Sequence, residues 1–209
     1  MAIWNTLSNS AHFELIFAVI EAARICIEAI LAILAADFLS GLVHWTEDTF
    51  WSENTPIVGK WIVQPNNLHH KNGTAFLEKN WWQSSWDLVL LGAFVVLVAG
   101  MCGMLYWQVW LFAIVGANAN QIHKWAHRRS SDLPAPVRIL QRLRIFQSFQ
   151  HHAEHHRHEK NSHYCLITNI ANPILDRTRF WRGLESLLVP IFTAPRRTDL
   201  SRSQQSFWR

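Results

Sequence analysis

The feature that most constrains this 209-residue chain is a stretch of 34 residues, Leu88–Gln121, that contains no Asp, Glu, Lys or Arg. A membrane-spanning helix needs about 20 apolar residues, so the stretch is too long for one span and short for two. Gly100 and Gly103 lie near its middle, where glycine can end a helix. We therefore predict a tight hairpin, with one helix from about 86 to 101 and a second from about 104 to 127.

The charges on either side of this stretch orient the hairpin. Three lysines precede it, a lysine and two arginines follow it, and its turn is uncharged (Lys60, Lys71, Lys79; Lys124, Arg128, Arg129). Because the cytoplasmic flanks of membrane helices are enriched in Lys and Arg, both open ends are predicted to face the cytoplasm. A soluble hairpin buried in a protein core is the alternative, and the length of the apolar run argues against it.

Helices are also predicted on both sides of the hairpin. Residues 4–22 are interrupted by charges and are predicted to form an interfacial helix, whereas residues 25–46 are predicted to form a membrane helix. The two could also be one bent helix. After Pro136, arginines alternate with apolar side chains in a pattern typical of a helix at the membrane surface, and residues 179–192 are expected to form another helix.

The expected fold is an all-α integral membrane protein with about three to four membrane helices plus interfacial amphipathic helices. An N-terminal interfacial segment (1–24) precedes the main domain (25–193), and a basic tail (194–209) follows it. The net charge of +4 fits a positive membrane face, and no nucleic-acid-binding motif accompanies it. The three cysteines are too far apart to indicate a disulfide framework or a CxxC metal site.

Residues 150–158, QHHAEHHRH, contain five histidines. At 100° per residue along a helix, His152, His155 and His156 share an arc of about 100°, the width of one helix face. His151 and His158 fall on the flank of that face. The run therefore contains a histidine triad that can point into one site, and two flanking histidines.

Three further groups of histidines adjoin predicted helices. NQIHKWAH places His123 and His127 four residues apart on one face, a spacing that can clamp a metal ion. PNNLHHKNG adds the adjacent His69 and His70, and FLSGLVHWTEDTF places His44 at the end of the first membrane helix. Since these groups meet at one predicted side of the membrane, we expect them to form a metal site with the triad.

Three other polar residues are candidate catalytic groups. Asp37 and Asp48 share a helix face with His44, and carboxylates so placed often orient ligand imidazoles. Asn120 lies within one helical turn of His123, inside the apolar stretch, where an amide needs a polar partner.

The histidine count indicates the chemistry. Eight imidazoles exceed the needs of one zinc ion, which takes three or four protein ligands, and they suit two first-row metal ions. Beside apolar walls that can hold a lipid chain, two iron ions could activate O2 to remove hydrogen from an unactivated C–H bond. The residues therefore indicate a di-iron oxidase acting on lipid. A zinc-dependent hydrolase and a non-enzymatic membrane sensor or metal-handling protein remain alternatives.

Several motifs carry a resemblance to a known family. ADFLSGLVHWTEDTF, PIVGK, NQIHKWAH, and HHAEHH followed by HYCLITNIANPILD resemble the lipid desaturase domain of the plasmanylethanolamine desaturases, also called the Kua family. The similarity runs from about Ala35 to Leu188, and the motifs stand in the family's order. The resemblance implies that residues 25–193 form a lipid desaturase domain. One branch of the family converts an alkyl ether to the vinyl ether of a plasmalogen, and a plant branch makes a trans-3 double bond in an acyl chain.

The resemblance also implies a set of site residues. The family's histidine pattern maps onto the eight positions that helical geometry selects (His44, His69, His70, His123, His127, His152, His155, His156). His151 and His163 are possible additional metal ligands. Four basic residues are expected to contact the lipid headgroup (Lys60, Lys71, Arg128, Arg129).

The implied activity is O2-dependent desaturation of a phospholipid chain by two Fe ions, and a lipid hydroxylase on the same scaffold is the alternative. The chain has no cysteine pattern for an iron–sulfur cluster, so electrons are expected from a separate cytochrome b5-like or ferredoxin-like protein. The histidine site is expected on the cytoplasmic side of a bacterial inner membrane, or of the endoplasmic reticulum in a eukaryote.

Overall fold

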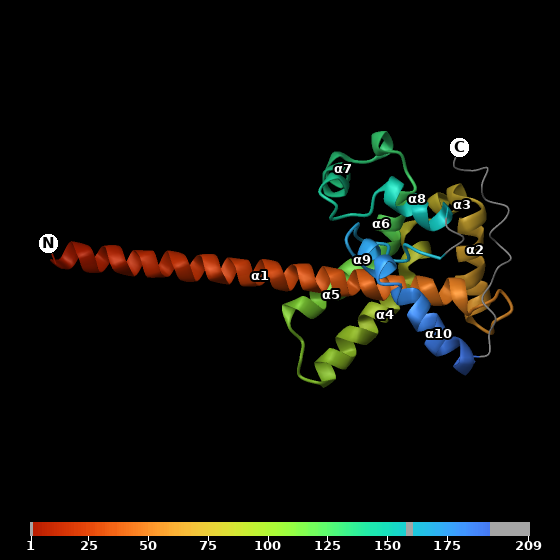
Figure 1. The fold of residues 1–209 in the computed structure, drawn as a ribbon, viewed down its shortest axis with the longest axis horizontal. Coiled ribbons are helices and arrows are strands. Elements are labelled where there is room, and N and C mark those ends of the chain that lie inside the picture. The colour runs from red at the N-terminus through yellow and green to blue at the C-terminus, as the bar shows by residue number, and fades with distance from the viewer. Residues whose placement is uncertain (1, 158–160, 193–209) are drawn as a thin grey trace.

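The computed structural model describes residues 2–157 and 161–192, and every regular element in these ranges is helical (Figure 1). The all-α prediction is thus confirmed for these residues. The elements are α1 (Ala2–Thr49), the π-helical turn η1 (Gly59–Val63), α2 (Gln64–Lys71), α3 (Gly73–Glu78), α4 (Trp81–Met101), α5 (Trp107–Ala117), α6 (Ala119–Ala126), the 3-10 turn η2 (Ser130–Asp132), α7 (Ala135–Arg142), α8 (Phe149–Arg157), α9 (Ala171–Arg177) and α10 (Phe180–Phe192). His158 and the predicted tail 194–209 lie outside the described residues.

The N-terminal region is one continuous helix, α1, rather than two helices at 4–22 and 25–46. No glycine or proline precedes Gly41, so the backbone has no reason to break. Arg24 pairs with both Glu21 and Glu28 along the helix surface, which offsets part of the negative charge near the predicted boundary. The N-terminal part of α1 extends away from the other helices (Figure 1).

The predicted hairpin is present as α4 and α5, but its first helix begins five residues earlier than expected. Asn80 caps α4 through a reciprocal pair of hydrogen bonds. Its side chain accepts from the Gln83 N–H at 2.9 Å, and the Gln83 side chain accepts from the Asn80 N–H at 2.9 Å. This capping box satisfies backbone groups that would otherwise lack partners at the helix start. Gly103, with φ +69°, supplies the left-handed residue in the turn.

The second helix of the hairpin differs from the prediction of a single helix over 104–127. It is interrupted at Asn118, where α5 ends and α6 begins. The Asn118 amide donates to the Ile114 carbonyl oxygen at 2.9 Å and accepts from Trp81 Nε1 at 3.0 Å. An asparagine side chain that bonds to nearby backbone in this way competes with helix continuation.

Helix α4 is, among the described residues, the one helix long and apolar enough to cross a membrane by length and composition, with a mean hydropathy of 1.9. Helices α1, α4 and α5 and the α4–α5 turn all expose large apolar side chains (Phe17, Leu31, Phe94, Leu97, Met104, Trp110). Exposed apolar surface on this scale marks a contact with a membrane or with another protein.

The irregular segment 161–170 lies against α1 and joins two small cores. One contains Ala36, Ala119, Ile122 and Ile167, and the other contains Trp45, Tyr164, Cys165 and Trp181. Gly41 allows the close approach, because a Cβ at that position would lie 2.6 Å from Cys165 Sγ. The segment thereby ties α1 to α6 and α10, on the side of α1 that carries His44.

Candidate metal centre

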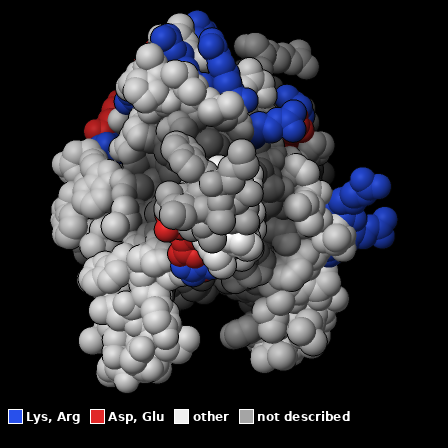
Figure 2. Space-filling model, turned by 90° about the vertical axis from the view of Figure 1, so that its left-hand side faces the viewer, with Lys and Arg blue, Asp and Glu red and all other residues white. Residues whose placement is uncertain are grey.

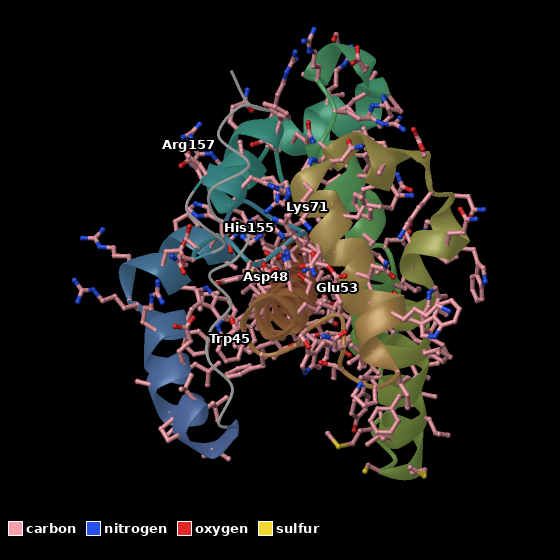
Figure 3. The ribbon with its side chains drawn as sticks, turned by 90° about the vertical axis from the view of Figure 1, so that its right-hand side faces the viewer. Trp45, Asp48, Glu53, Lys71, His155 and Arg157 are labelled. Atoms are coloured by element: carbon pink, nitrogen blue, oxygen red, sulfur yellow. The ribbon has the colours of Figure 1, made fainter. Side chains whose placement is uncertain are left out.

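Four helices bring nine residues with metal-ligating side chains together in the middle of the molecule. They form two groups, within each of which one ligand atom per residue lies within 4.8 Å of all the others. The first, the five-histidine group, is His69, His123, His127, His152 and His156; the second, the Asp48 group, is His44, Asp48, His70 and His155. Figure 3, viewed along α1, shows Asp48 and His155 near the centre of the fold.

The structure brings all eight predicted histidines into these groups. Helix α8 contributes to both, since His152 and His156 belong to the five-histidine group and His155 to the Asp48 group. Helix α2 also contributes to both, since His69 belongs to the five-histidine group and His70 to the Asp48 group. The helical spacing predicts that these side chains share a face, but the division into two groups appears only in the folded chain.

The nitrogens of the five-histidine group converge closely. His152 Nε2 lies 2.8 Å from His123 Nε2 and 3.0 Å from His156 Nε2, and His123 Nε2 lies 3.2 Å from His127 Nε2. Both ring nitrogens of the buried His69 lack a hydrogen-bond partner in the part of the chain that the structure describes. Since buried polar atoms are nearly always satisfied, this arrangement fits a bound cation that accepts the nitrogen lone pairs.

Burial keeps these imidazoles neutral. It lowers the pKa of His69, His152 and His156 well below the usual value, and repulsion among the neighbouring imidazoles lowers it further. A metal ion binds only the deprotonated ring nitrogen. The group is therefore ready to bind a metal ion at neutral pH without first losing protons.

In the Asp48 group, backbone carbonyl oxygens fix the orientation of two imidazole rings, those of His44 and His155. The Nδ1 atoms of His44 and His155 lie 3.2 Å from the Tyr164 carbonyl oxygen and 2.7 Å from the Ser162 carbonyl oxygen. Their Nε2 atoms face Asp48 Oδ2 at 3.4 and 3.3 Å. Carbonyl oxygens behind metal-binding imidazoles set the tautomer in this way, so the Nε2 side is the one that can bind a metal.

The position of Asp48 therefore differs from the one expected from the sequence. The sequence-based expectation is that Asp48 orients imidazoles without binding the metal ion itself. Its oxygens lie on the Nε2 side of His44, His70 and His155, where a ligand would stand. The orienting positions are already taken by backbone carbonyls of segment 161–170. Asn66 donates to Asp48 Oδ1 at 2.9 Å and holds the carboxylate in place.

Asp37 also differs from expectation, because its hydrogen bonds go to the backbone of segment 161–170 rather than to an imidazole. It accepts from the Ile167 N–H at 2.7 Å, the Thr168 N–H at 3.1 Å and the Thr168 hydroxyl at 2.6 Å. The same segment presents the carbonyl groups that orient His44 and His155. Asp37 thus acts on the Asp48 group through the backbone that it holds against α1.

Replacing Asp37 with Asn is expected to destabilise the metal-free protein by about 1–3 kcal/mol, because an amide cannot accept all three of these hydrogen bonds. Thermal unfolding of the purified protein measures the effect. Asp132→Asn is the matched control, since Asp132 is exposed on η2. An unchanged melting temperature for Asp37→Asn would show that the segment is held by other contacts.

The remaining predicted residues lie around the two groups. The Asn120 amide donates to the Ser84 carbonyl oxygen and links α6 to α4. His151 and His163 lie outside both groups and contact each other edge to face, with ring centroids 4.8 Å apart. His151 lies beside Asn172 and His163 beside Asp176, and burial, with the neighbouring His163, lowers the pKa of His151 to about 4.

A cavity of about 80 Å3 opens onto both groups, through His44 on one side and His69 and His123 on the other. Beyond Ser40, Val43 and Leu88 it adjoins a smaller apolar cavity between α1, α4 and α5. Small residues line this second cavity (Ala36, Gly92, Ala113, Gly116). The two cavities together lead from the histidines towards the exposed apolar helices.

The four residues predicted to bind a headgroup do not gather at one place. Lys60 lies over the ring of Trp61, whose side chain lines the first cavity, whereas Arg129 lines a separate hollow beside α7 and α8. The cation that lines the first cavity is Lys79, with Glu47 and Asp87 as its carboxylates. Sequence reasoning missed these three residues, because only the folded chain shows that Glu47 of α1, Asp87 of α4 and Lys79, which precedes α4, share a cavity.

Comparisons with known proteins find similarity to lipid desaturases. The lipid desaturase domain family matches residues 33–199. Plasmanylethanolamine desaturase 1 of Mus musculus is 31% identical over 94% of this chain and 77% of its own length. Plasmanylethanolamine desaturase of Myxococcus xanthus is 32% identical over 77% of this chain and 59% of its own length. Fatty acid desaturase 4, chloroplastic, of Arabidopsis thaliana is 31% identical over 78% of this chain and 52% of its own length.

No solved structure matches the chain. The matched residues include both groups of the metal centre and the segment that orients them. The predicted resemblance is confirmed, and the chain belongs to the lipid desaturase domain family.

Proposed function

We propose that the protein is a membrane-bound, O2-dependent di-iron desaturase that introduces a double bond into the chain of a phospholipid, with a plasmanylethanolamine-type ether lipid as substrate. The observation that carries the proposal is the pair of adjacent histidine-rich groups that opens onto one cavity leading between apolar helices. The names of the mouse and Myxococcus relatives supply the ether-lipid class.

One set of residues would bind the metal ions, and another would hold the lipid chain. The five-histidine group and the Asp48 group would each hold one iron ion, and bound iron supplies the O2 activation that no side chain can perform. The small residues Ala36, Gly92 and Ala113 leave room for an alkyl chain between α1, α4 and α5. Ser40 and Val43 would then guide the chain towards His44 and His123.

The membrane arrangement follows from the same surfaces. Helices α4 and α5, with the part of α1 that packs against α5, would lie in the bilayer, and the metal centre would lie at its cytoplasmic edge. Lys79, whose pKa is lowered by burial, and the carboxylates Glu47 and Asp87 line the cavity, where the polar headgroup would enter. This set holds both signs of charge, which suits a zwitterionic headgroup better than an anionic one.

A second candidate substrate is an ester-linked acyl chain. The similarity to the Arabidopsis fatty acid desaturase 4 favours it, at an identity equal to that of the mouse relative. Both reactions remove two hydrogens from adjacent carbons, so the metal centre and the chain path would serve either one.

Lipid profiles of cells that express the protein, grown with and without O2, test the proposal. We expect a vinyl ether product about 2 Da lighter than its alkyl ether precursor, formed only with O2, and about two iron ions per purified chain. A new double bond in an ester-linked chain would instead support the second candidate. A product about 16 Da heavier would indicate a hydroxylase, and one zinc ion per chain without any oxidised lipid would contradict the proposal.

A further inference from the structure

A second, basic hollow lies on the far side of α8 from the metal centre. Its volume is about 800 Å3, and residues from η2, α7, α8 and α9 line it. Four arginines surround it (Arg129, Arg138, Arg142, Arg144). Helix α7 lies at the top of Figure 1, and Figure 2 shows lysine and arginine gathered at the same end of the molecule, far from the α4–α5 turn.

The charge of this hollow is not balanced within the described part of the chain. None of its four arginines forms an ion pair there, and the single carboxylate that lines it, Glu154, pairs with Arg157. Ile139 and Leu143 of α7, which are 53% and 62% exposed, adjoin these arginines in the chain but do not line the hollow. Arginine is enriched at protein–protein interfaces, and a surface with unpaired positive charge selects an acidic partner.

Helix α8 is the wall between this hollow and the metal centre. Gln150, His151 and Glu154 line the hollow, whereas His152 and His156 on the other face belong to the five-histidine group. A lipid substrate in the hollow could not reach the metal centre, because α8 stands between them. An electron carrier needs only to come near the metal ions and not to touch them, so one helix of separation suits a carrier.

We propose that the hollow formed by α7 and α8 is the docking surface for an acidic one-electron carrier protein. The inference rests on the proposed oxidase function, which needs such a partner. Reduction of O2 to two water molecules takes four electrons and four protons. The substrate's two hydrogens supply two of each, the carrier supplies two electrons one at a time, and solvent supplies two protons.

The test measures binding and electron delivery separately, on the metal-loaded, full-length protein in detergent. The probes are a soluble acidic cytochrome b5 haem domain and a soluble acidic [2Fe–2S] ferredoxin, and the one that reduces the wild-type protein faster is used. The variant Arg138→Glu/Arg142→Glu reverses two charges one turn apart on α7. The control Arg177→Glu/Arg179→Glu makes the same change at exposed residues near the α9–α10 turn.

We expect the α7 variant to bind the carrier at least about tenfold more weakly than the wild type, while the control binds within about twofold. Higher salt should weaken wild-type binding. Turnover driven by dithionite should stay unchanged in both variants, which shows that the metal centre and the lipid path are intact.

Three outcomes would contradict the proposed docking surface. In the first, neither probe reduces the wild-type protein, and in the second, both variants bind the carrier as the wild type does. In the third, the α7 variant loses only its binding to phosphatidylglycerol vesicles. The last would make the hollow a membrane contact. A wild-type protein that forms no product even with dithionite would instead contradict the proposed oxidase function, while carrier binding would still report on the surface.

Discussion

Replacing His155 with Ala is expected to lower desaturase activity by about 1000-fold or more, to the background of cells that lack the protein. His155 is fully buried, its Nε2 faces Asp48 Oδ2 at 3.3 Å, and its Nδ1 lies 2.7 Å from the Ser162 carbonyl oxygen. Alanine removes a proposed metal ligand, and the Ser162 carbonyl oxygen loses the imidazole that it orients. The vinyl ether content of expressing cells measures the loss.

Metal content distinguishes this result from simple misfolding. The purified His155→Ala protein should keep about one of two iron ions, because the five-histidine group remains complete. His12→Ala is the control, since His12 is exposed on α1 away from both groups, and it should match the wild type in metal content and product. Full activity of His155→Ala would refute the assignment of the Asp48 group.

The histidines could be predicted from the sequence because their spacing is local. His152, His155 and His156 share one face of any helix that contains them, whatever the rest of the chain does. Their division between two groups depends on how α2 and α8 meet. That contact joins residues far apart in the chain, and helical periodicity carries no information about it.

The roles of the two aspartates show the same limit. Asp37 and Asp48 both lie on the histidine-bearing side of α1, and from the sequence both appear equally able to orient imidazoles. Segment 161–170 separates their roles, since its N–H groups bind Asp37 while its carbonyl groups take the orienting positions behind His44 and His155. An irregular segment has no repeating spacing of side chains from which its contacts could be predicted.

The boundaries of the helices were predicted less well than their existence. The uncharged stretch predicts the hairpin, but α4 begins at Trp81 because of the Asn80–Gln83 capping box. The second helix is interrupted because the Asn118 side chain binds the Ile114 carbonyl oxygen and Trp81. Both are side-chain contacts of single residues, which a hydropathy pattern averages away.

Replacing Asp48 with Asn is expected to lower activity by about 100-fold or more, although the size of the side chain hardly changes. The amide keeps one oxygen that can bind a metal ion. It lacks the negative charge with which the carboxylate offsets the positive charge of that ion. The metal ion of the Asp48 group should therefore bind at least about tenfold more weakly, which titration of the metal-free protein with Fe2+ or Co2+ measures.

The stability of the metal-free protein then separates a ligand from a structural residue. Asp48 stands among three buried imidazoles, where a carboxylate is costly without a cation, so Asp48→Asn should melt no lower than the wild type. Asp37→Asn should melt lower, because it loses hydrogen bonds to segment 161–170. If Asp48→Asn instead lowers the melting temperature and leaves metal affinity unchanged, Asp48 is a structural residue and the Asp48 group holds its metal ion with three imidazoles alone.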